Sequence, residues 1–133
     1  MKISCGTDII EIDRIKSSIE NIGEKFLNTI YTKKEIEYCE SRKAQKYQHY
    51  AARFAAKEAI FKALSTRIGT KYTWKDFEVL NDENGKPKVF LNIEIPRFFQ
   101  HQNDKCMPFH HTFLQTNGQS RCKHYGSYQK ICQ

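Results

Sequence analysis

The order of patterns along this chain predicts an α+β fold in which a long central helix packs on a mainly antiparallel sheet. Residues 41–65 contain no glycine or proline and are rich in alanine, lysine and glutamine, as helices are. Two apolar runs flank the turn signal Asn84-Gly85-Lys86-Pro87, a pattern typical of a β-hairpin. A β-rich run and two shorter helical segments precede them, and this segregated order favours an α+β domain.

The N-terminal part contains two predicted helices. The β-rich run covers residues 3–10 and ends in Thr7-Asp8. Asp13 can then cap a short helix that Gly23 can stop, because isoleucines recur at helical spacing between them. Residues 32–35, Thr-Lys-Lys-Glu, have the form of a capping box, which predicts a second helix running towards Cys39.

The long helix should extend from Ser41 to about Ser65, and the hairpin should follow it. The predicted core face of this helix consists of small and apolar residues, namely Ala52, Ala56, Ala59, Ile60, Ala63 and Leu64. The strands of the hairpin should contain Phe77 and Val79 on one side and the run Val89-Phe90-Leu91 on the other.

Length and composition indicate a soluble protein with a single domain over residues 1–133. The hydrophobic residues make up 39% and the charged residues 28%, and no apolar run is long enough to cross a bilayer. The N-terminus lacks the apolar core of a secretion signal, so we expect a cytoplasmic protein. The five cysteines form no compact framework, which favours reduced thiols. The net charge of +7 favours anionic partners without choosing among them.

Two acidic residues are candidates for a metal site. Glu58 lies in a stripe of apolar and small residues on the long helix, and Lys62 follows one turn later. They form either a surface pair, worth roughly 0.3–0.5 kcal/mol, or a metal-binding carboxylate with a phosphate-binding lysine beside it. Asp8 is either a solvated strand end or a second carboxylate of that site. Mg²⁺ prefers such oxygen ligands, and Arg53, Lys57 and Lys62 add the positive charge that phosphoryl-group chemistry needs.

Two motifs in this chain resemble the signatures of holo-acyl-carrier-protein synthases. They are GTDIIEIDRI at residues 6–15 and AARFAAKEAIFKAL at residues 51–64. Phe26, the Thr32-to-Glu35 element, Cys39 and the stretch from Trp74 to Pro87 follow in the order that this family shows. The resemblance covers residues 3–95, and the paired motifs are highly specific.

The resemblance implies a small, trimeric 4′-phosphopantetheinyl transferase that acts in fatty acid biosynthesis. Such enzymes use coenzyme A and Mg²⁺, place the phosphopantetheine arm on a serine of acyl carrier protein, and release adenosine 3′,5′-bisphosphate. Asp8 and Glu58 match the Mg²⁺ ligands of the family, and Lys62 matches the lysine near the reacting phosphate. Arg53 matches a basic residue of the coenzyme A pocket, and Arg14 matches the basic position that contacts the acidic carrier protein.

The C-terminal part departs from the family pattern. Residues 96–133 hold 5 Lys+Arg but 1 Asp+Glu, together with four of the five histidines. The family ends in a Ser-x-Ser-His-type strand and an apolar strand, whereas Arg121 stands here where the histidine is expected. Residues 126–131 are too polar for a buried strand. Either this end has diverged and kept its function, with Arg121, His110 or His111 serving the phosphate, or it is not a native family ending, as after a shifted reading frame.

Other classes of protein fit the sequence less well. A zinc site could use the cysteines and histidines near the C-terminus (Cys106, His110, His111, Cys122, His124 and Cys132), but no Cys-x₂-Cys pair exists among them. The aromatic and basic cluster at residues 47–54 is compatible with nucleic-acid binding, yet core and pocket packing explain it better. The main alternative is a non-catalytic or impaired relative that keeps the fold or carrier-protein binding.

Overall fold

The computed structural model describes residues 3–4, 6–64 and 71–92, together with the backbone of four short strands beyond residue 105. The elements, in chain order, are β1 (Ile3–Ser4), α1 (Ile12–Ile22), α2 (Glu24–Ile30), α3 (Lys33–Ser41), the 3₁₀ turn η1 (Lys43–Gln45), α4 (Lys46–Ala63), the 3₁₀ turn η2 (Trp74–Asp76), β2 (Phe77–Asn81), β3 (Pro87–Leu91), β4 (Cys106–Pro108), β5 (Phe113–Gln115), β6 (Lys123–Tyr125) and β7 (Ile131–Cys132).

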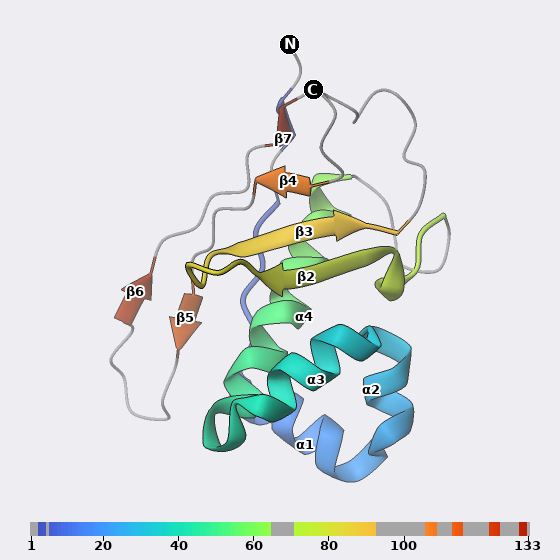
Figure 1. The fold of residues 1–133 in the computed structure, drawn as a ribbon, viewed down its shortest axis with the longest axis vertical. Coiled ribbons are helices and arrows are strands. Elements are labelled where there is room, and N and C mark those ends of the chain that lie inside the picture. Colours follow the sequence, from blue (N-terminus) through green and yellow to red (C-terminus); the bar gives the residue numbers. More distant parts are fainter. Residues whose placement is uncertain are drawn as a thin grey trace.

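Helix α4 runs through the centre of the described fold, as Figure 1 shows. Helices α1, α2 and α3 gather around one end of α4, and the β2–β3 hairpin crosses in front of its other end. All strand pairs are antiparallel, so the predicted α+β class with a mainly antiparallel sheet is confirmed. No helix of the described part is both long and apolar enough to span a membrane.

The first helix begins two residues earlier than predicted. Glu11 is its N-cap and makes no side-chain capping bond, so Asp13 lies in the first turn instead of capping it. Gly23 ends α1 as predicted, because its φ of 69° favours glycine and its amide donates to the carbonyl of Ile19 at 2.8 Å. Helix α2 follows directly and was not predicted, since its seven residues are too few to show a clear period.

The capping box at the start of α3 is confirmed, and a break in the helical backbone separates the end of α3 from α4. The amide of Glu35 donates to the Thr32 hydroxyl at 3.3 Å, and the Thr32 amide donates to Glu35 Oε2 at 2.8 Å. The prediction that one helix starts at Ser41 was wrong, because α3 ends there and α4 begins at Lys46. Lys43, with a φ of 50°, breaks the helical backbone between them.

A three-stranded sheet contains the predicted hairpin and β4, a strand that was not predicted, while β1 and β7 form a separate two-stranded sheet. In the hairpin Val79 pairs with Val89, and Gly85 adopts the positive φ of 76° that the turn requires. Strand β4 pairs with β3 on its other side, and β7 pairs with β1. Strand β7 was not predicted, because residues 126–131 are polar and a strand of two residues is too short to show alternation. The side chains of residues 93–133, including the zinc candidates, lie outside the described residues.

The core consists of two clusters, one at each end of α4. One cluster joins α4 to the hairpin and contains Ala56, Ile60, Phe61, Tyr72, Phe77, Val79 and Val89. The other joins it to the helices and contains Ile15, Ile30, Tyr31, Cys39, Tyr50 and Ala51. Of the predicted core face, Ala56, Ala59, Ile60 and Ala63 are buried, whereas Ala52 and Leu64 are half-buried. Helix α4 therefore buries more of its circumference than a one-sided core helix does.

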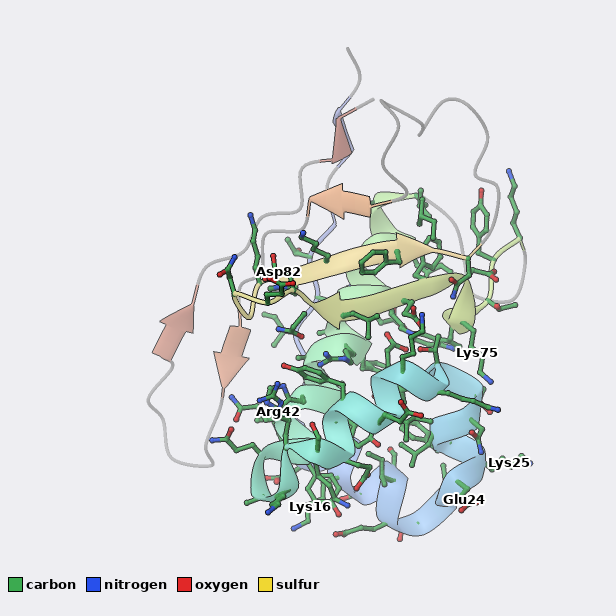
Figure 2. The ribbon with its side chains drawn as sticks, in the orientation of Figure 1. Lys16, Glu24, Lys25, Arg42, Lys75 and Asp82 are labelled. Atoms are coloured by element: carbon green, nitrogen blue, oxygen red, sulfur yellow. The ribbon has the colours of Figure 1, made fainter. Side chains whose placement is uncertain are left out.

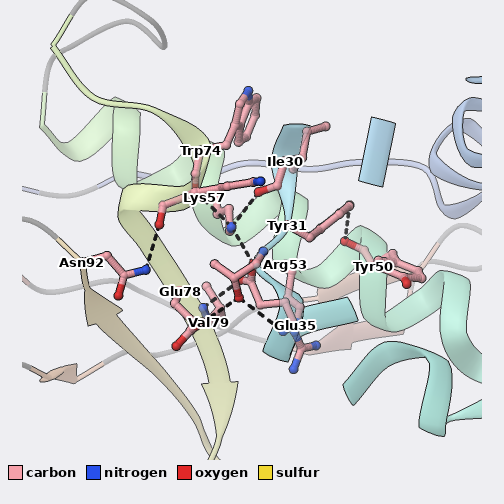
Figure 3. Close-up of polar contacts among 12 residues, drawn as sticks. Ile30, Tyr31, Glu35, Tyr50, Arg53, Lys57, Trp74, Glu78, Val79 and Asn92 are labelled. Atoms are coloured by element: carbon pink, nitrogen blue, oxygen red, sulfur yellow. Dashed lines mark hydrogen bonds and ion pairs between the residues drawn. The ribbon is translucent and has the colours of Figure 1, made fainter. Parts of the chain in front are cut away.

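A buried ion pair lies between the two clusters, as the close-up in Figure 3 shows. Lys57 Nζ donates to Glu35 Oε2 at 2.7 Å and to the carbonyl oxygens of Ile30 at 2.8 Å and Trp74 at 3.0 Å. The other carboxylate oxygen of Glu35 accepts from the Val79 amide at 2.8 Å. Burial lowers the pKa of Lys57, and the neighbouring Glu35 opposes that shift. Three bonds to the ammonium group satisfy all its donors.

We predict that Lys57→Met destabilises the protein by about 3–5 kcal/mol, because it leaves the Glu35 carboxylate buried without its counter-charge. Denaturant unfolding measures this change. Lys46→Met is the matched control, because Lys46 lies on the same helix as Lys57. The change breaks an exposed 3.0 Å pair between Lys46 and Glu40 and should cost less than about 1 kcal/mol. Equal losses for the two variants would contradict the special role of the buried pair.

Candidate functional site

The site begins with a close contact between the N-terminal segment and α4. Gly6 is buried against the backbone of Ala59 and Ala63. A Cβ atom placed on Gly6 would lie 2.7 Å from the Ala63 nitrogen and would overlap the Ala59 carbonyl oxygen. Only a residue without a side chain allows this approach. The next two residues, Thr7 and Asp8, are therefore held beside the C-terminal half of α4.

Asp8 and Lys62 form an ion pair where the N-terminal segment meets α4. Lys62 Nζ donates to Asp8 Oδ1 at 2.6 Å and to the carbonyl of Thr7 at 3.1 Å. The Lys62 side chain is 53% exposed, whereas that of Asp8 is 15% exposed. The ion pair predicted as one alternative joined Lys62 to Glu58; in the structure the partner of Lys62 is Asp8, which sequence spacing along a helix cannot show.

Glu58 completes a group of two carboxylates and one ammonium. Its pKa is raised, first by partial burial and then by the negative charge of Asp8, while Lys62 lowers it. A carboxylate whose ionised state is disfavoured by a second negative charge fits a nearby cation, because the cation relieves that repulsion. The ammonium of Lys62 is already bound to one of them. The donor set of hard oxygens suits Mg²⁺, which needs few protein ligands and keeps several waters.

No group of three or more potential metal-binding side chains occurs in the described part of the chain. A closed structural metal site of the zinc type would need such a group. The Asp8–Glu58 pair is instead an open arrangement, in which most ligands of a bound cation would come from water or from a substrate. Such an arrangement suits catalysis on a phosphate-bearing molecule.

Arg53 lies on the other side of α4. It is nine residues before Lys62, so the two side chains are about 180° apart around the helix. Arg53 is only 2% exposed, and its guanidinium donates to Asn81 Oδ1 at 2.8 Å and stacks 4.2 Å from the centre of the Tyr38 ring. Within the described residues its Nε atom has no hydrogen-bond partner. The structure therefore does not bring Arg53 together with the three charged residues at Asp8.

Positive charge gathers around Arg53. The Tyr38 ring also contacts Arg42, whose guanidinium lies 4.4 Å from the ring centre. Figure 2 labels Arg42 at the end of α3. The pKa of His49 is lowered, first by burial and then by the charges of Arg53 and Arg42. This end of α4 is consequently electropositive, which favours an anionic ligand.

Arg14 is exposed on α1 and forms no ion pair with the other residues that the structure describes. The surface of α1 and α2 carries both signs of charge, as Lys16, Glu24 and Lys25 show in Figure 2. The helix therefore presents a mixed surface with Arg14 near its N-terminal end. This placement neither joins Arg14 to the Asp8 group nor prevents it from contacting a separate partner.

Two residues that position the site were missed in the sequence. Gly6 directly precedes Thr7-Asp8, and an isolated glycine inside a strand pattern is a known signal of close backbone approach. The prediction that Lys57 adds positive charge for phosphate was wrong, because its ammonium is fully buried and bonded to Glu35. The sequence does not signal this burial, since lysine is rarely buried. The partner of Lys57, Glu35, was predicted only as part of the capping box.

Comparison with known proteins places these residues in a family context. The sequence model of the 4′-phosphopantetheinyl transferase superfamily matches residues 4–122. The holo-[acyl-carrier-protein] synthase of Ruminiclostridium cellulolyticum is 56% identical over 99 residues, which cover 74% of this chain and 74% of that protein. The synthase of Solibacter usitatus is 51% identical over 98 residues, or 74% and 78% of the two chains.

Solved structures give the same result. The holo-(acyl-carrier-protein) synthase of Bacillus anthracis in complex with CoA (3′,5′-ADP) has a TM-score of 0.61 and 38% identity, over 68% of this chain and 76% of that chain. The synthase of Helicobacter pylori in complex with coenzyme A has a TM-score of 0.60 and 31% identity, over 68% and 74% of the two chains.

We predict that Gly6→Ala destabilises the protein by about 1–3 kcal/mol, because the new methyl group overlaps the α4 backbone. It should also shift the NMR signals of Asp8 and Glu58, since the two segments must separate. Gly85→Ala is the control: it has no atom within 4 Å of its new Cβ, so its cost of roughly 1 kcal/mol comes only from the positive φ. Unchanged Asp8 and Glu58 signals in Gly6→Ala would show that the contact does not position the site.

Proposed function

This chain belongs to the holo-[acyl-carrier-protein] synthases of the 4′-phosphopantetheinyl transferase superfamily, and from that membership we infer that it is a transferase acting on coenzyme A. It moves the 4′-phosphopantetheine group to a serine of acyl carrier protein, which converts the apo form into the holo form for fatty acid biosynthesis. The observation that carries this conclusion is 56% identity to a synthase over 74% of both chains.

For Asp8 and Glu58 we propose the role of magnesium ligands. The support is the raised pKa of Glu58 and the proximity of Asp8 on a segment held to α4 by Gly6. When bound, Mg²⁺ supplies positive charge to the phosphate oxygens of the substrate. Asp8 and Glu58 would hold the cation beside α4, because Gly6 anchors the segment of Asp8 to that helix and Glu58 belongs to it.

Lys62 supplies a second positive charge beside the same carboxylates. Its half-exposed ammonium group extends from α4 and can reach a phosphate that approaches Asp8. There it stabilises charge on the departing phosphate oxygen and on the serine oxygen as that oxygen loses its proton. We therefore propose Lys62 as a catalytic residue that acts through its charge.

For Arg53 we propose a place at the coenzyme A pocket. The support is its electropositive surroundings and its Nε atom, which has no partner within the described residues. Because Arg53 is buried and bonded to Asn81, it would act from beneath the pocket and hold the β2 end in place. Its contribution is then separate from that of the Asp8 group.

We further propose a homotrimer in the cytoplasm, as the family resemblance implies. Light scattering would measure the mass in solution, and a monomer at micromolar concentration would contradict this assembly.

An impaired or non-catalytic relative is the second candidate function. The observation that favours it is the C-terminal sequence, which lacks the family's Ser-His element and places Arg121 there.

The deciding experiment is mass spectrometry of apo acyl carrier protein incubated with coenzyme A, Mg²⁺ and this chain. We expect a gain of one phosphopantetheine that chelation of the metal abolishes. Glu58→Gln should lower the rate by about 10²–10³, since it removes one charge from the metal site. Glu37→Gln, an exposed change on α3, is the matched control. No transfer by the folded wild-type chain would establish the non-catalytic alternative.

We also propose that Arg14 docks the acidic carrier protein. Arg14→Glu should weaken carrier-protein binding and reduce its dependence on salt, because opposite charges attract less as ions screen them. Lys86→Glu, an equal change of charge in the hairpin turn, should have little effect. Binding titrations at two ionic strengths measure both variants. If Arg14→Glu binds as wild type at low salt, the docking surface lies elsewhere.

A further inference from the structure

The Lys62 ammonium lies beside the Asp8 carboxylate, where a bound metal ion would also lie. Its 2.6 Å bond to Asp8 Oδ1 is one of the shortest charged contacts in the described part of the structure. Asp8 is 15% exposed, so its carboxylate has limited access to water and gains much from an opposite charge. The same carboxylate is one of the two oxygen donors proposed for magnesium.

A dication and this ammonium cannot both lie close to the Asp8 carboxylate without repelling each other. Like charges a few ångströms apart in a partly buried site disfavour one another strongly. The backbone that carries the Asp8 side chain and the Thr7 carbonyl is held by the contact of Gly6 with α4, so this segment cannot move away to make room. The lysine side chain is the part free to move, because it is flexible and 53% exposed.

We propose that Lys62 and the divalent cation compete for Asp8, so that metal loading detaches the Lys62 ammonium and frees it for the phosphates of the substrate. This inference rests on the proposed function, because it assumes that Asp8 is a metal ligand. In the metal-free protein Lys62 neutralises Asp8 and restrains the carboxylate pair. In the loaded protein the cation takes over that task, and Lys62 becomes available only when the metal is in place.

The competition has a consequence for metal affinity that differs from a simple loss of function. A lysine that only assisted catalysis would leave metal affinity unchanged when replaced. A lysine that competes for Asp8 weakens metal binding in the wild type, so its removal tightens binding. We expect Lys62→Met to bind Mn²⁺, used as a spectroscopic probe for Mg²⁺, about 3- to 10-fold more tightly without coenzyme A.

The titration includes two further variants. Lys46→Met removes the same charge from the same helix and also breaks a lysine–carboxylate pair, so it corrects for net charge and should leave Mn²⁺ affinity unchanged. Asp8→Asn should weaken binding by at least about 10-fold. If Asp8→Asn weakens binding but Lys62→Met binds as wild type does, the competition is wrong and the proposed metal site stands. If Asp8→Asn binds as wild type does, the metal assignment itself fails.

NMR of the lysine ammonium groups tests the displacement directly. Lys62 and Lys57 both donate charged hydrogen bonds to carboxylates, so both should give protected ammonium signals in the metal-free protein. Addition of Mg²⁺ should remove or strongly shift the Lys62 signal and leave that of Lys57 in place, because Lys57 is buried away from the site. A Lys62 signal that persists at saturating Mg²⁺ would overturn the proposal.

Discussion

The buried pair of Lys57 and Glu35 determines how the rest of the molecule is arranged. One ammonium group binds the end of α2, the start of α3 and the turn before β2, while the opposing carboxylate binds the Val79 amide of β2. Burying two charges costs much desolvation energy, which the Coulomb attraction and the full set of hydrogen bonds offset. Such a pair tolerates little change in geometry. It therefore fixes the rotation of α4 about its own axis.

That rotation decides which way the functional charges point. Glu58 follows Lys57 directly, so a helix turned to bury Lys57 must direct Glu58 away from the pair and towards the N-terminal segment. Lys62, one turn after Glu58, faces the same segment and reaches Asp8. Arg53 faces the opposite way and is held by Asn81 and Tyr38. Helix α4 thus carries charge on all sides, and each group is placed by a different neighbouring element.

The sequence predicts local structure well where one short pattern determines it. The capping box at Thr32, the helix end at Gly23 and the turn at Gly85 each follow from the chemistry of two to four residues. Features that depend on distant parts of the chain were not predictable in this way. Neither the pairing of Lys62 with Asp8 nor the burial of Lys57 has a local signal, because both partners come from elsewhere in the fold. The same holds for β4 and β7, whose two or three residues become strands only through their partners.

The pairing of β1 with β7 has a consequence for how the chain folds during synthesis. Ile3 pairs with Cys132, so β1 leaves the ribosome long before its partner strand β7 does. Contacts of such long sequence separation form late, because the entropy of closing a long loop opposes them. The contact of Gly6 with α4 spans less than half that distance, so it can form while the C-terminal part is still being translated. The nascent chain can thus hold Asp8 against α4 before its terminal strands have met.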